Sequence, residues 1–146
     1  MFQSPRGLLK AEDLTALLES EGVSKSSIIH VTGLHALPAI LWLCRHEYQH
    51  VSYIQPAAGA LHEEADAVLF AHTCDEIHLK HLLRTAREVR TGGVLIFQIP
   101  NAPEADQLPL DWMLQSAGFV VHRRIAGERR TLFIARRNAA AIRRAA

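Results

Sequence analysis

The amino-acid sequence predicts an α/β protein, in which a mostly parallel sheet lies between two layers of helices. Runs of β-branched and apolar residues alternate with stretches of helical periodicity along most of the chain. This alternation implies right-handed crossovers between parallel strands. The runs at 66–72 and 94–100 are almost entirely apolar, which is typical of central strands covered on both faces. Two final β-like stretches are close enough to pair as an antiparallel hairpin, so the sheet is expected to be mixed.

The first expected element is a helix over about residues 10–21, with Gly22 as its natural stop. Its apolar residues share one helical face: Ala11, Leu14, Leu17 and Leu18. Later helices are expected at 35–48, 75–90 and 108–118. Strands are expected at 27–33, 50–56, 66–72, 94–100, 119–126 and 131–137. Pro38 is acceptable because it falls in the first turn of its helix.

The length of 146 residues fits one domain, which we expect to span residues 1–137. Residues 138–146 are expected to be a basic, frayed tail. The longest apolar run, residues 37–44, is too short to span a bilayer, and the N-terminus lacks the apolar core of a signal peptide. These features predict a cytoplasmic protein with no membrane partner. Cys44 lies within an apolar helical pattern, which predicts a buried free thiol.

The order of elements between Asp66 and Arg137 points to a family. A strand that opens with Asp66 is followed by a helix, the Gly92-Gly93 turn and another strand. A helix ending in Gly118-Phe119 and the final hairpin complete the pattern. In this order and spacing the chain resembles the class I S-adenosylmethionine-dependent methyltransferases.

The resemblance implies a three-layer, Rossmann-like sheet with the strand order 2-1-3-4-6-5, numbered along this chain. Between Pro56 and Asp66 there is too little chain for a full crossover. The third strand of the family is therefore expected to be missing. The ligand crevice would lie at the carboxyl ends of the strands, near the first and third strands.

The cofactor corner of the family is poorly matched in this chain. The family's first loop is rich in glycine, but here Gly33 stands alone, with Leu34 and His35 where small residues are expected. The family also tends to place an acid after the second strand, where this chain has Gln55. Both departures favour loss of the cofactor. If S-adenosylmethionine is bound, the candidate contacts are Gly33, His35, Gln55 and His72.

The segment after the third strand carries the candidates for catalysis. His72 and Asp75 could act as acid or base, although neither is favoured. Thr73 and Glu76 have the spacing of a capping box, and this structural role is the favoured interpretation. Nine histidines raise the question of a metal. No acid or thiolate completes a known ligand spacing, so we expect no metal site.

Arginines are concentrated near the C-terminus, with eight from Arg123 onward and Glu128 as the only acid there. Such asymmetry can mark a nucleic acid or another acidic partner. The candidate contacts are Arg123, Arg124, Arg136 and Arg137. However, only Phe133 interleaves with them, and alternation places it in the core. Charges on an edge hairpin also suppress aggregation, and a solvated or partner-facing edge is favoured.

These observations favour a divergent methyltransferase-like domain that does not methylate and acts as a binding, regulatory or assembly module. One alternative is a small S-adenosylmethionine-dependent methyltransferase with a reduced cofactor site and an acceptor near His72 and Asn101. A second alternative is a nucleic-acid-binding protein. The run at 37–44 is apolar almost all round its helix, which suggests a self-associating face and a homodimer or another protein partner.

Overall fold

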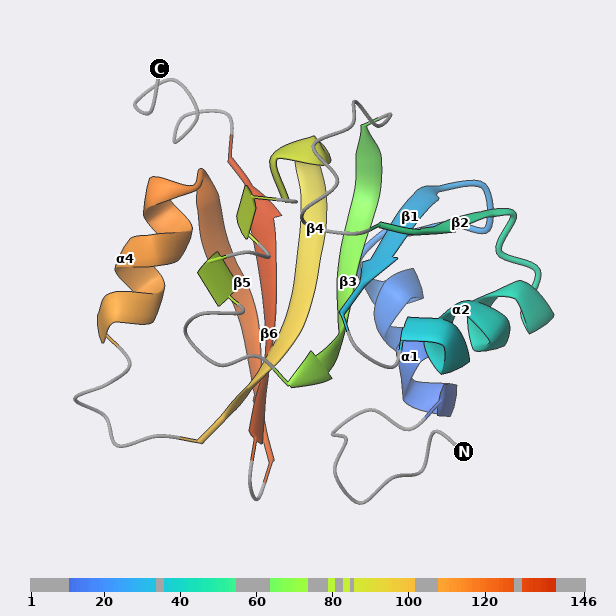
Figure 1. The fold of residues 1–146 in the computed structure, drawn as a ribbon, viewed down its shortest axis with the longest axis horizontal. Helices are drawn as coiled ribbons and strands as arrows, with labels where there is room; N and C mark the ends of the chain where they lie inside the picture. Colours follow the sequence, from blue (N-terminus) through green and yellow to red (C-terminus); the bar gives the residue numbers. More distant parts are fainter. Residues whose placement is uncertain are drawn as a thin grey trace.

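A computed structural model describes residues 11–33, 36–54, 64–73, 79–80, 83–84, 86–101, 108–127 and 130–138. These residues form a six-stranded mixed sheet with helices packed against it (Figure 1). The strands are β1 (Ile28–Thr32), β2 (His50–Tyr53), β3 (Ala65–Thr73), β4 (Val89–Pro100), β5 (Phe119–Ala126) and β6 (Arg130–Arg137). The helices are α1 (Ala11–Ser20), α2 (Ala36–Arg45), the short 3-10 helix η1 (Ala86–Glu88) and α4 (Leu108–Ser116).

The strand order is β2-β1-β3-β4-β6-β5, as predicted. The first four strands in this order are parallel, and β6 runs antiparallel to both β4 and β5. The parallel part and the C-terminal hairpin are thus both confirmed. β2 and β5 are the two edges of the described sheet, because the first pairs only with β1 and the second only with β6.

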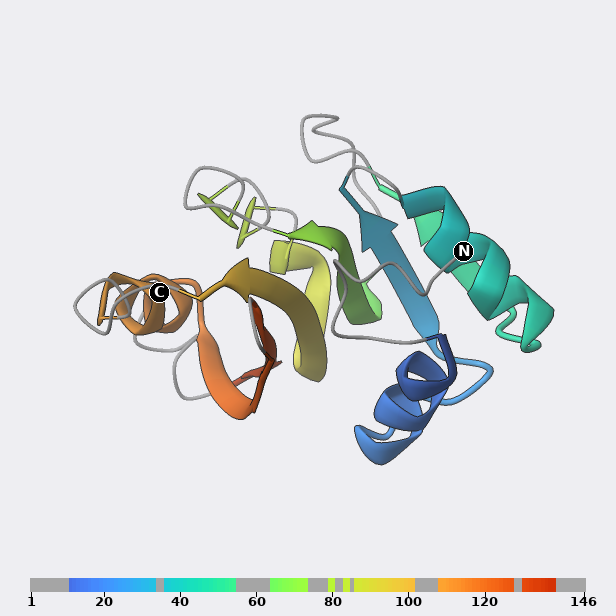
Figure 2. The ribbon, with the colours of Figure 1, turned by 90° about the horizontal axis from the view of Figure 1, so that it is seen from below.

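The sheet separates two hydrophobic clusters, one on each face. α1 and α2 cover one face, where Leu14, Leu18 and Leu43 pack against Val31 and Ile96. On the other face, α4 and the short helical pieces between β3 and β4 cover a second cluster (Figure 2). Its members include Phe70, Leu79, Phe97, Leu114, Phe119 and Phe133. This arrangement gives the three layers that the sequence predicts.

Glycines end two helices where the sequence predicts them. Gly22 and Gly118 follow α1 and α4 with φ angles of 80° and 88°, the left-handed region in which a helix commonly stops. The observed α1 and α4 lie within the predicted ranges. None of the described helices is long and apolar enough to cross a bilayer.

The predicted helix at 75–90 is wrong at its end, because β4 already begins at Val89. The pairing passes from Ala65–Val89 to Ala67–Val94, so the intervening residues of β4 leave the ladder. Gly93 makes this excursion possible. A Cβ there would lie 2.6 Å from Val89 Cγ1 and 2.9 Å from the carbonyl oxygen of Asp66. Gly92 and Gly93 therefore lie within an irregular first part of β4, and not only in a turn before the strand.

The predicted burial of Cys44 is also wrong, because its side chain is exposed. α2 buries Ala36, Ala39 and Leu43 against the sheet. Since successive residues of a helix turn by about 100°, Cys44 lies on the flank next to Leu43. α2 packs near the β2 edge of the sheet. No described element covers the side of α2 that faces away from the sheet. Cys74 lies outside the described residues.

Candidate functional site at the carboxyl edge of the sheet

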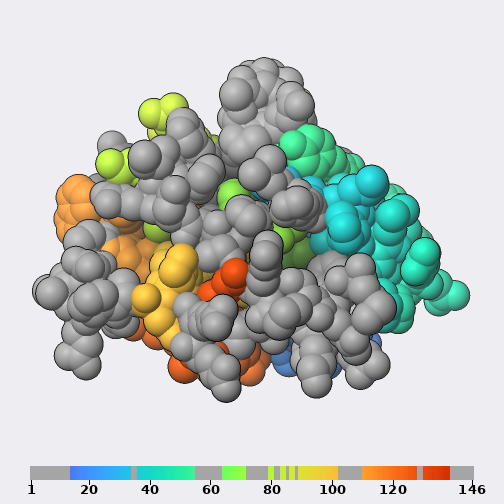
Figure 3. Space-filling model, turned by 60° about the horizontal axis from the view of Figure 1, so that its bottom comes forward, coloured from blue at the N-terminus to red at the C-terminus, as the bar shows by residue number. Residues whose placement is uncertain are grey.

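β1, β2, β3 and β4 are parallel, so their carboxyl ends lie on the same edge of the sheet; those of β1, β3 and β4 point downward in Figure 1. Ligands of open α/β sheets bind outside this edge. The described residues here include Thr32 and Gly33 after β1, Tyr53 and Ile54 at the end of β2, and Phe70 in β3. Figure 3 turns this edge toward the reader. These residues form the candidate site.

Gly33 forms the bend that follows β1. Its φ of 97° is one that side chains rarely adopt. A Cβ on Gly33 would lie 3.2 Å from two ring carbons of Phe70, closer than ordinary van der Waals contact. Thr32 and Phe70 are partners in the β1–β3 ladder, which sets the ring beneath the bend. The need for glycine is therefore explained by the packing of the chain itself, and the ring closes one side of the bend.

Thr32 is the buried polar residue of this corner. Its side chain is fully buried, and its Oγ1 has no hydrogen-bond partner. An unpaired buried hydroxyl costs free energy. Thr32 was not singled out in the sequence, because threonine is ordinary in strands and its burial depends on β3. Among the described residues of this corner, it is the buried hydroxyl that a ligand could use.

β3 is irregular where the predicted catalytic residue lies. Leu69 pairs with Ile96 and Thr73 with Gln98, so four steps along β3 match two along β4. His72 falls within this irregular stretch, near the end of the strand. Such irregularities re-aim side chains and are frequent beside active sites. The backbone of His72 is thus placed at the candidate edge, whereas its side chain lies outside the described part.

Several predicted site residues lie outside the described residues. These are Leu34, His35, Gln55, Asp75 and Glu76. The expectation that Leu34 and His35 fill the crevice therefore stays a prediction, as does the capping box. Among the described residues, the carboxyl edge of β1 to β3 offers one buried hydroxyl and no carboxylate. Whether S-adenosylmethionine is bound therefore stays a prediction, since the expected contacts His35 and Gln55 lie outside the described residues.

Asn101, the other residue suggested for an acceptor site, is used by the fold. Its Nδ2 donates to the carbonyl oxygen of Gly127 at 3.0 Å, and its Oδ1 accepts from the Thr131 hydroxyl at 2.7 Å. Both ends of the amide therefore join the end of β4 to the turn and second strand of the β5–β6 hairpin. The side chain has a structural role that the sequence did not predict.

Asp66 lies at the opposite, amino edge of the sheet. Its Oδ2 accepts the backbone N–H of Ile28 at 2.8 Å, and its Oδ1 accepts from Arg90 Nε. Burial alone would raise the pKa of Asp66, but these hydrogen bonds and the charge of Arg90 outweigh it and lower the pKa. The carboxylate thus joins β1, β3 and β4. Its position agrees with the predicted role at the entry of a strand.

The arginines at the C-terminus are engaged within the chain. Arg123 and Arg136 contact the carboxylate of Glu21 at 3.1 and 3.0 Å, and Arg136 also donates to the Glu21 and Gly92 carbonyls. The Glu21 side chain is only 2% exposed. His122 Nε2 lies 3.6 Å from the same carboxylate. Glu21 follows α1, so this cluster fastens the first helix to the C-terminal hairpin.

Arg124 and Arg137, the other two arginines predicted to contact an acidic partner, also bind groups within the chain. Arg124 donates to Asp111 of α4 at 2.6 Å, and its guanidinium lies 5.3 Å from the centre of the Phe133 ring. Arg137 Nη1 donates to backbone carbonyls of Ala86, Arg87 and Val89. Arg123, Arg136 and Arg137 therefore hold together elements far apart in the sequence, and Arg124 joins β5 to the preceding α4. This gives them a structural role without a nucleic acid, although binding to one stays an untested prediction.

Within the ranges that the structure describes, no three His, Cys, Asp or Glu side chains come together in a way that could hold a metal ion. His50 and His122 are exposed, while His30 is buried in β1. The sequence did not single out His30, because its burial depends on the central position of β1 in the sheet.

Comparison with known proteins identifies the architecture. No family model and no curated protein matches the sequence. Among solved structures, a putative RNA methyltransferase from Pyrococcus horikoshii is similar with a TM-score of 0.62 at 13% identity, over 94% of this chain and 90% of that chain. The chain has the class I methyltransferase-like Rossmann fold.

Two further structures with this fold come from different methyltransferases. A putative sarcosine dimethylglycine methyltransferase from Galdieria sulphuraria has a TM-score of 0.63 at 11% identity, over 88% of this chain and 85% of that chain. The magnesium protoporphyrin IX methyltransferase of Synechocystis, solved with bound S-adenosylmethionine, has a TM-score of 0.58 at 15% identity, over 88% and 78%. At such low identity the likeness shows the fold and not the activity.

Proposed function

We propose that this chain is a methyltransferase-like domain that has kept the architecture of the cofactor corner and acts as a binding or assembly module without methyl transfer. The observation that carries the proposal is the packing of Gly33 against Phe70. A glycine in a cofactor loop serves the close approach of a ligand. Here a Cβ on Gly33 would lie 3.2 Å from the Phe70 ring at a φ of 97°, so the fold of the chain itself favours the glycine.

The described charges support the same proposal. Asp66, Glu21 and Asp111 are paired with arginines, and these pairs join helices and strands. None of the three lies at the carboxyl edge of β1 to β3. A charged group that would recognise a ligand is therefore lacking among the described residues of this corner.

Calorimetric titration of the full chain with S-adenosylmethionine and S-adenosylhomocysteine tests the proposal. We expect no heat of binding and no rise in melting temperature at about 1 mM ligand. A ligand at a hundred times its dissociation constant would stabilise the fold by about 2.7 kcal/mol, which a thermal scan would detect. Binding in the micromolar range would overturn the proposal.

The second candidate is a small S-adenosylmethionine-dependent methyltransferase with a reduced site. It is supported by the similar structures that were solved with bound S-adenosylmethionine or S-adenosylhomocysteine. The unpaired Thr32 hydroxyl also favours it, because a ligand could satisfy this group. This candidate predicts binding that is weakened in Thr32→Val, a variant of nearly the same shape. Absence of binding to the unmodified chain would exclude it.

A further inference from the structure

The two edge strands of the sheet differ in how they are protected against pairing with another chain. β5 carries His122, Arg123 and Arg124, and its ladder with β6 is interrupted between Val121 and Arg123. Charges and bulges are the means by which edge strands avoid pairing. β2 (His50–Tyr53) carries no acidic or basic residue other than its histidine, no proline and an unbroken register with β1. Among the strands that the structure describes, the β2 edge is therefore the one without these protections.

The backbone N–H and C=O groups of alternate residues in β2 point outward, away from β1. Ile54 donates its N–H to the carbonyl oxygen of Val31 at 2.9 Å. Because the backbone groups of successive strand residues point to opposite sides, those of Val51 and Tyr53 point away from β1. In the described part of the chain no strand lies on that side. β2 thus presents donors and acceptors that an added strand would satisfy.

α2 presents an apolar flank beside this edge. Leu37 and Leu41 are 64% and 48% exposed. They lie one helical turn apart, on the side of α2 away from the buried Ala36, Ala39 and Leu43. In a right-handed crossover from β1 through α2 to β2, Leu37 leans toward the β2 side and Leu41 points outward beside it. α2 lies at the surface at one end of the molecule (Figure 3).

We propose that β2 and α2 bind a second copy of this chain. A two-fold axis perpendicular to the sheet would pair the two β2 strands antiparallel, so that two sheets become one. The same axis keeps both α2 helices on one face, side by side, where Leu37 and Leu41 of each copy would be covered. The proposal deepens the proposed function, since it names the partner of an assembly module.

A second copy fits this surface better than a peptide strand. An added peptide strand would pair with β2 but would leave the α2 flank exposed, whereas a second copy covers both. Charge favours the same partner, because residues 36–54 carry only Arg45 and Glu47 and are thus neutral overall. The β5 edge instead carries Arg123 and Arg124 and an interrupted ladder, which oppose the addition of a strand. The described surface is therefore suited to self-association at β2 and not at β5.

The test is the mass of the full chain in solution, measured by sedimentation and light scattering. We expect twice 16.3 kDa for the unmodified chain. Leu41→Glu places a charge in the contact and should weaken dimerisation at least about tenfold. Tyr53→Pro removes an N–H that points away from β1. Proline is tolerated at such an edge position, so this variant should be a folded monomer.

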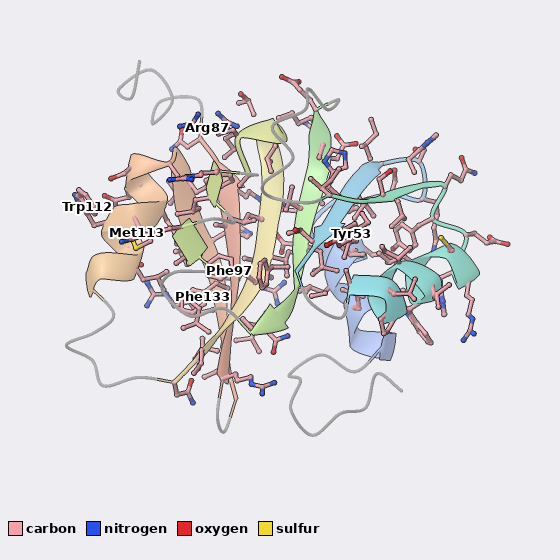
Figure 4. The ribbon with its side chains drawn as sticks, viewed as in Figure 1. Tyr53, Arg87, Phe97, Trp112, Met113 and Phe133 are labelled. Atoms are coloured by element: carbon pink, nitrogen blue, oxygen red, sulfur yellow. The ribbon has the colours of Figure 1, made fainter. Side chains whose placement is uncertain are left out.

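Two variants are matched controls. Trp112→Glu changes an exposed side chain of α4 that points away from the sheet, on the side opposite α2 (Figure 4), and should remain a dimer. Tyr53→Thr keeps the backbone N–H and should also remain a dimer. Circular dichroism and thermal unfolding check the fold of each variant.

A monomeric unmodified chain would overturn the proposal, as would a dimer that Leu41→Glu leaves intact. If Tyr53→Thr is as monomeric as Tyr53→Pro, pairing through the backbone of β2 is wrong. Titration of monomeric Leu41→Glu with S-adenosylmethionine keeps the two proposals apart. Binding there would overturn the proposed function and leave the dimer contact unaffected.

Discussion

Gly33 and Phe70 illustrate how a residue that looks like a cofactor contact can be required by the fold. The bend after β1 needs a positive φ, and the ring of Phe70 lies under it. Sequence position alone would assign this glycine to a ligand. Its φ and its neighbour assign it to packing between β1 and β3. The distinction can be measured, because another glycine in the chain has the same backbone without the neighbour.

Gly33→Ala should lower the free energy of unfolding by about 1 to 3 kcal/mol, owing to backbone strain and contact with Phe70. Gly22→Ala is the matched control, since Gly22 has a φ of 80° but nothing within 4 Å of a Cβ. The loss for Gly22 should therefore be smaller. Urea unfolding measures both. Equal losses would show that the Phe70 contact adds nothing.

Thr32→Val should raise the free energy of unfolding by about 1 kcal/mol, because it removes a buried hydroxyl without a partner and keeps the branched shape. Thr131→Val is the control, since that hydroxyl donates to Asn101 and its removal should destabilise. Chemical denaturation compares them. Destabilisation by Thr32→Val would mean that the hydroxyl makes a bond in solution.

At the scale of elements, two clusters of charge hold the layers together. Asp66 fastens the amino edges of β1, β3 and β4, and Glu21 fastens α1 to the hairpin of β5 and β6. Both carboxylates accept from arginines of other elements. Arginines of the β5–β6 hairpin thus have a structural role, because they join the hairpin to α1. Predictions for these clusters concern stability and its pH dependence.

Asp66→Asn should cost about 1 to 2 kcal/mol, through loss of charge-assisted hydrogen bonds on a partly exposed side chain. The pKa of Asp66 in the folded state lies below its ordinary value of 3.8. The stabilisation is therefore present above pH 3.8 and is lost as the pH falls through the lower folded-state pKa.

Unfolding at a series of pH values measures this effect. The difference between the unmodified chain and Asp66→Asn should shrink as the solution is acidified. Glu64→Gln, an exposed neighbour, is the control and should change little. A constant difference down to pH 2 would contradict the assigned role.

Glu21→Gln should lower stability by about 2 kcal/mol, because it leaves Arg123 and Arg136 without their shared carboxylate. Exposure of the two guanidinium groups limits the loss. Glu19→Gln changes an exposed acid nearby and should stay within about 0.5 kcal/mol of the unmodified chain. Thermal unfolding at low salt provides the comparison. Similar melting temperatures for both variants would show that the cluster does not stabilise α1.

At the scale of the whole molecule, charge and apolar surface are separated. The β5 edge is basic, whereas the β2 edge with α2 is apolar and neutral. The basic edge has internal partners for Arg123 and Arg124. The apolar edge has none among the described residues. Because the arginines of the basic edge already have partners and the apolar edge has none in the described part of the chain, we expect the intact chain to self-associate and not to bind nucleic acid.

The intact chain should therefore not retard single-stranded RNA or duplex DNA in a gel at low salt, where phosphate contacts are strongest. Arg130→Ala provides a check, because Arg130 forms no ion pair with the acidic side chains that the structure describes. Retardation that weakens in Arg130→Ala or in Arg124→Ala would restore the nucleic-acid hypothesis.

The sequence alone determined the order of elements, the parallel core and the C-terminal hairpin, whereas the strand order followed from the resemblance to a known family. Local patterns suffice for the first three features, because apolar runs and helical periodicity reflect burial by immediate neighbours, and crossover handedness is nearly fixed. The same patterns placed Gly22 and Gly118 at the ends of helices.

Only the tertiary structure decided what the individual polar residues do. Arg136 and Glu21 are 115 positions apart in the chain, and no local pattern predicts that they meet. Cys44 was misjudged for a related reason, since helical periodicity cannot tell which flank of α2 lacks a neighbour. Whether Gly33 serves a ligand or Phe70 likewise depends on β3, which packs beside β1 only after the chain has folded.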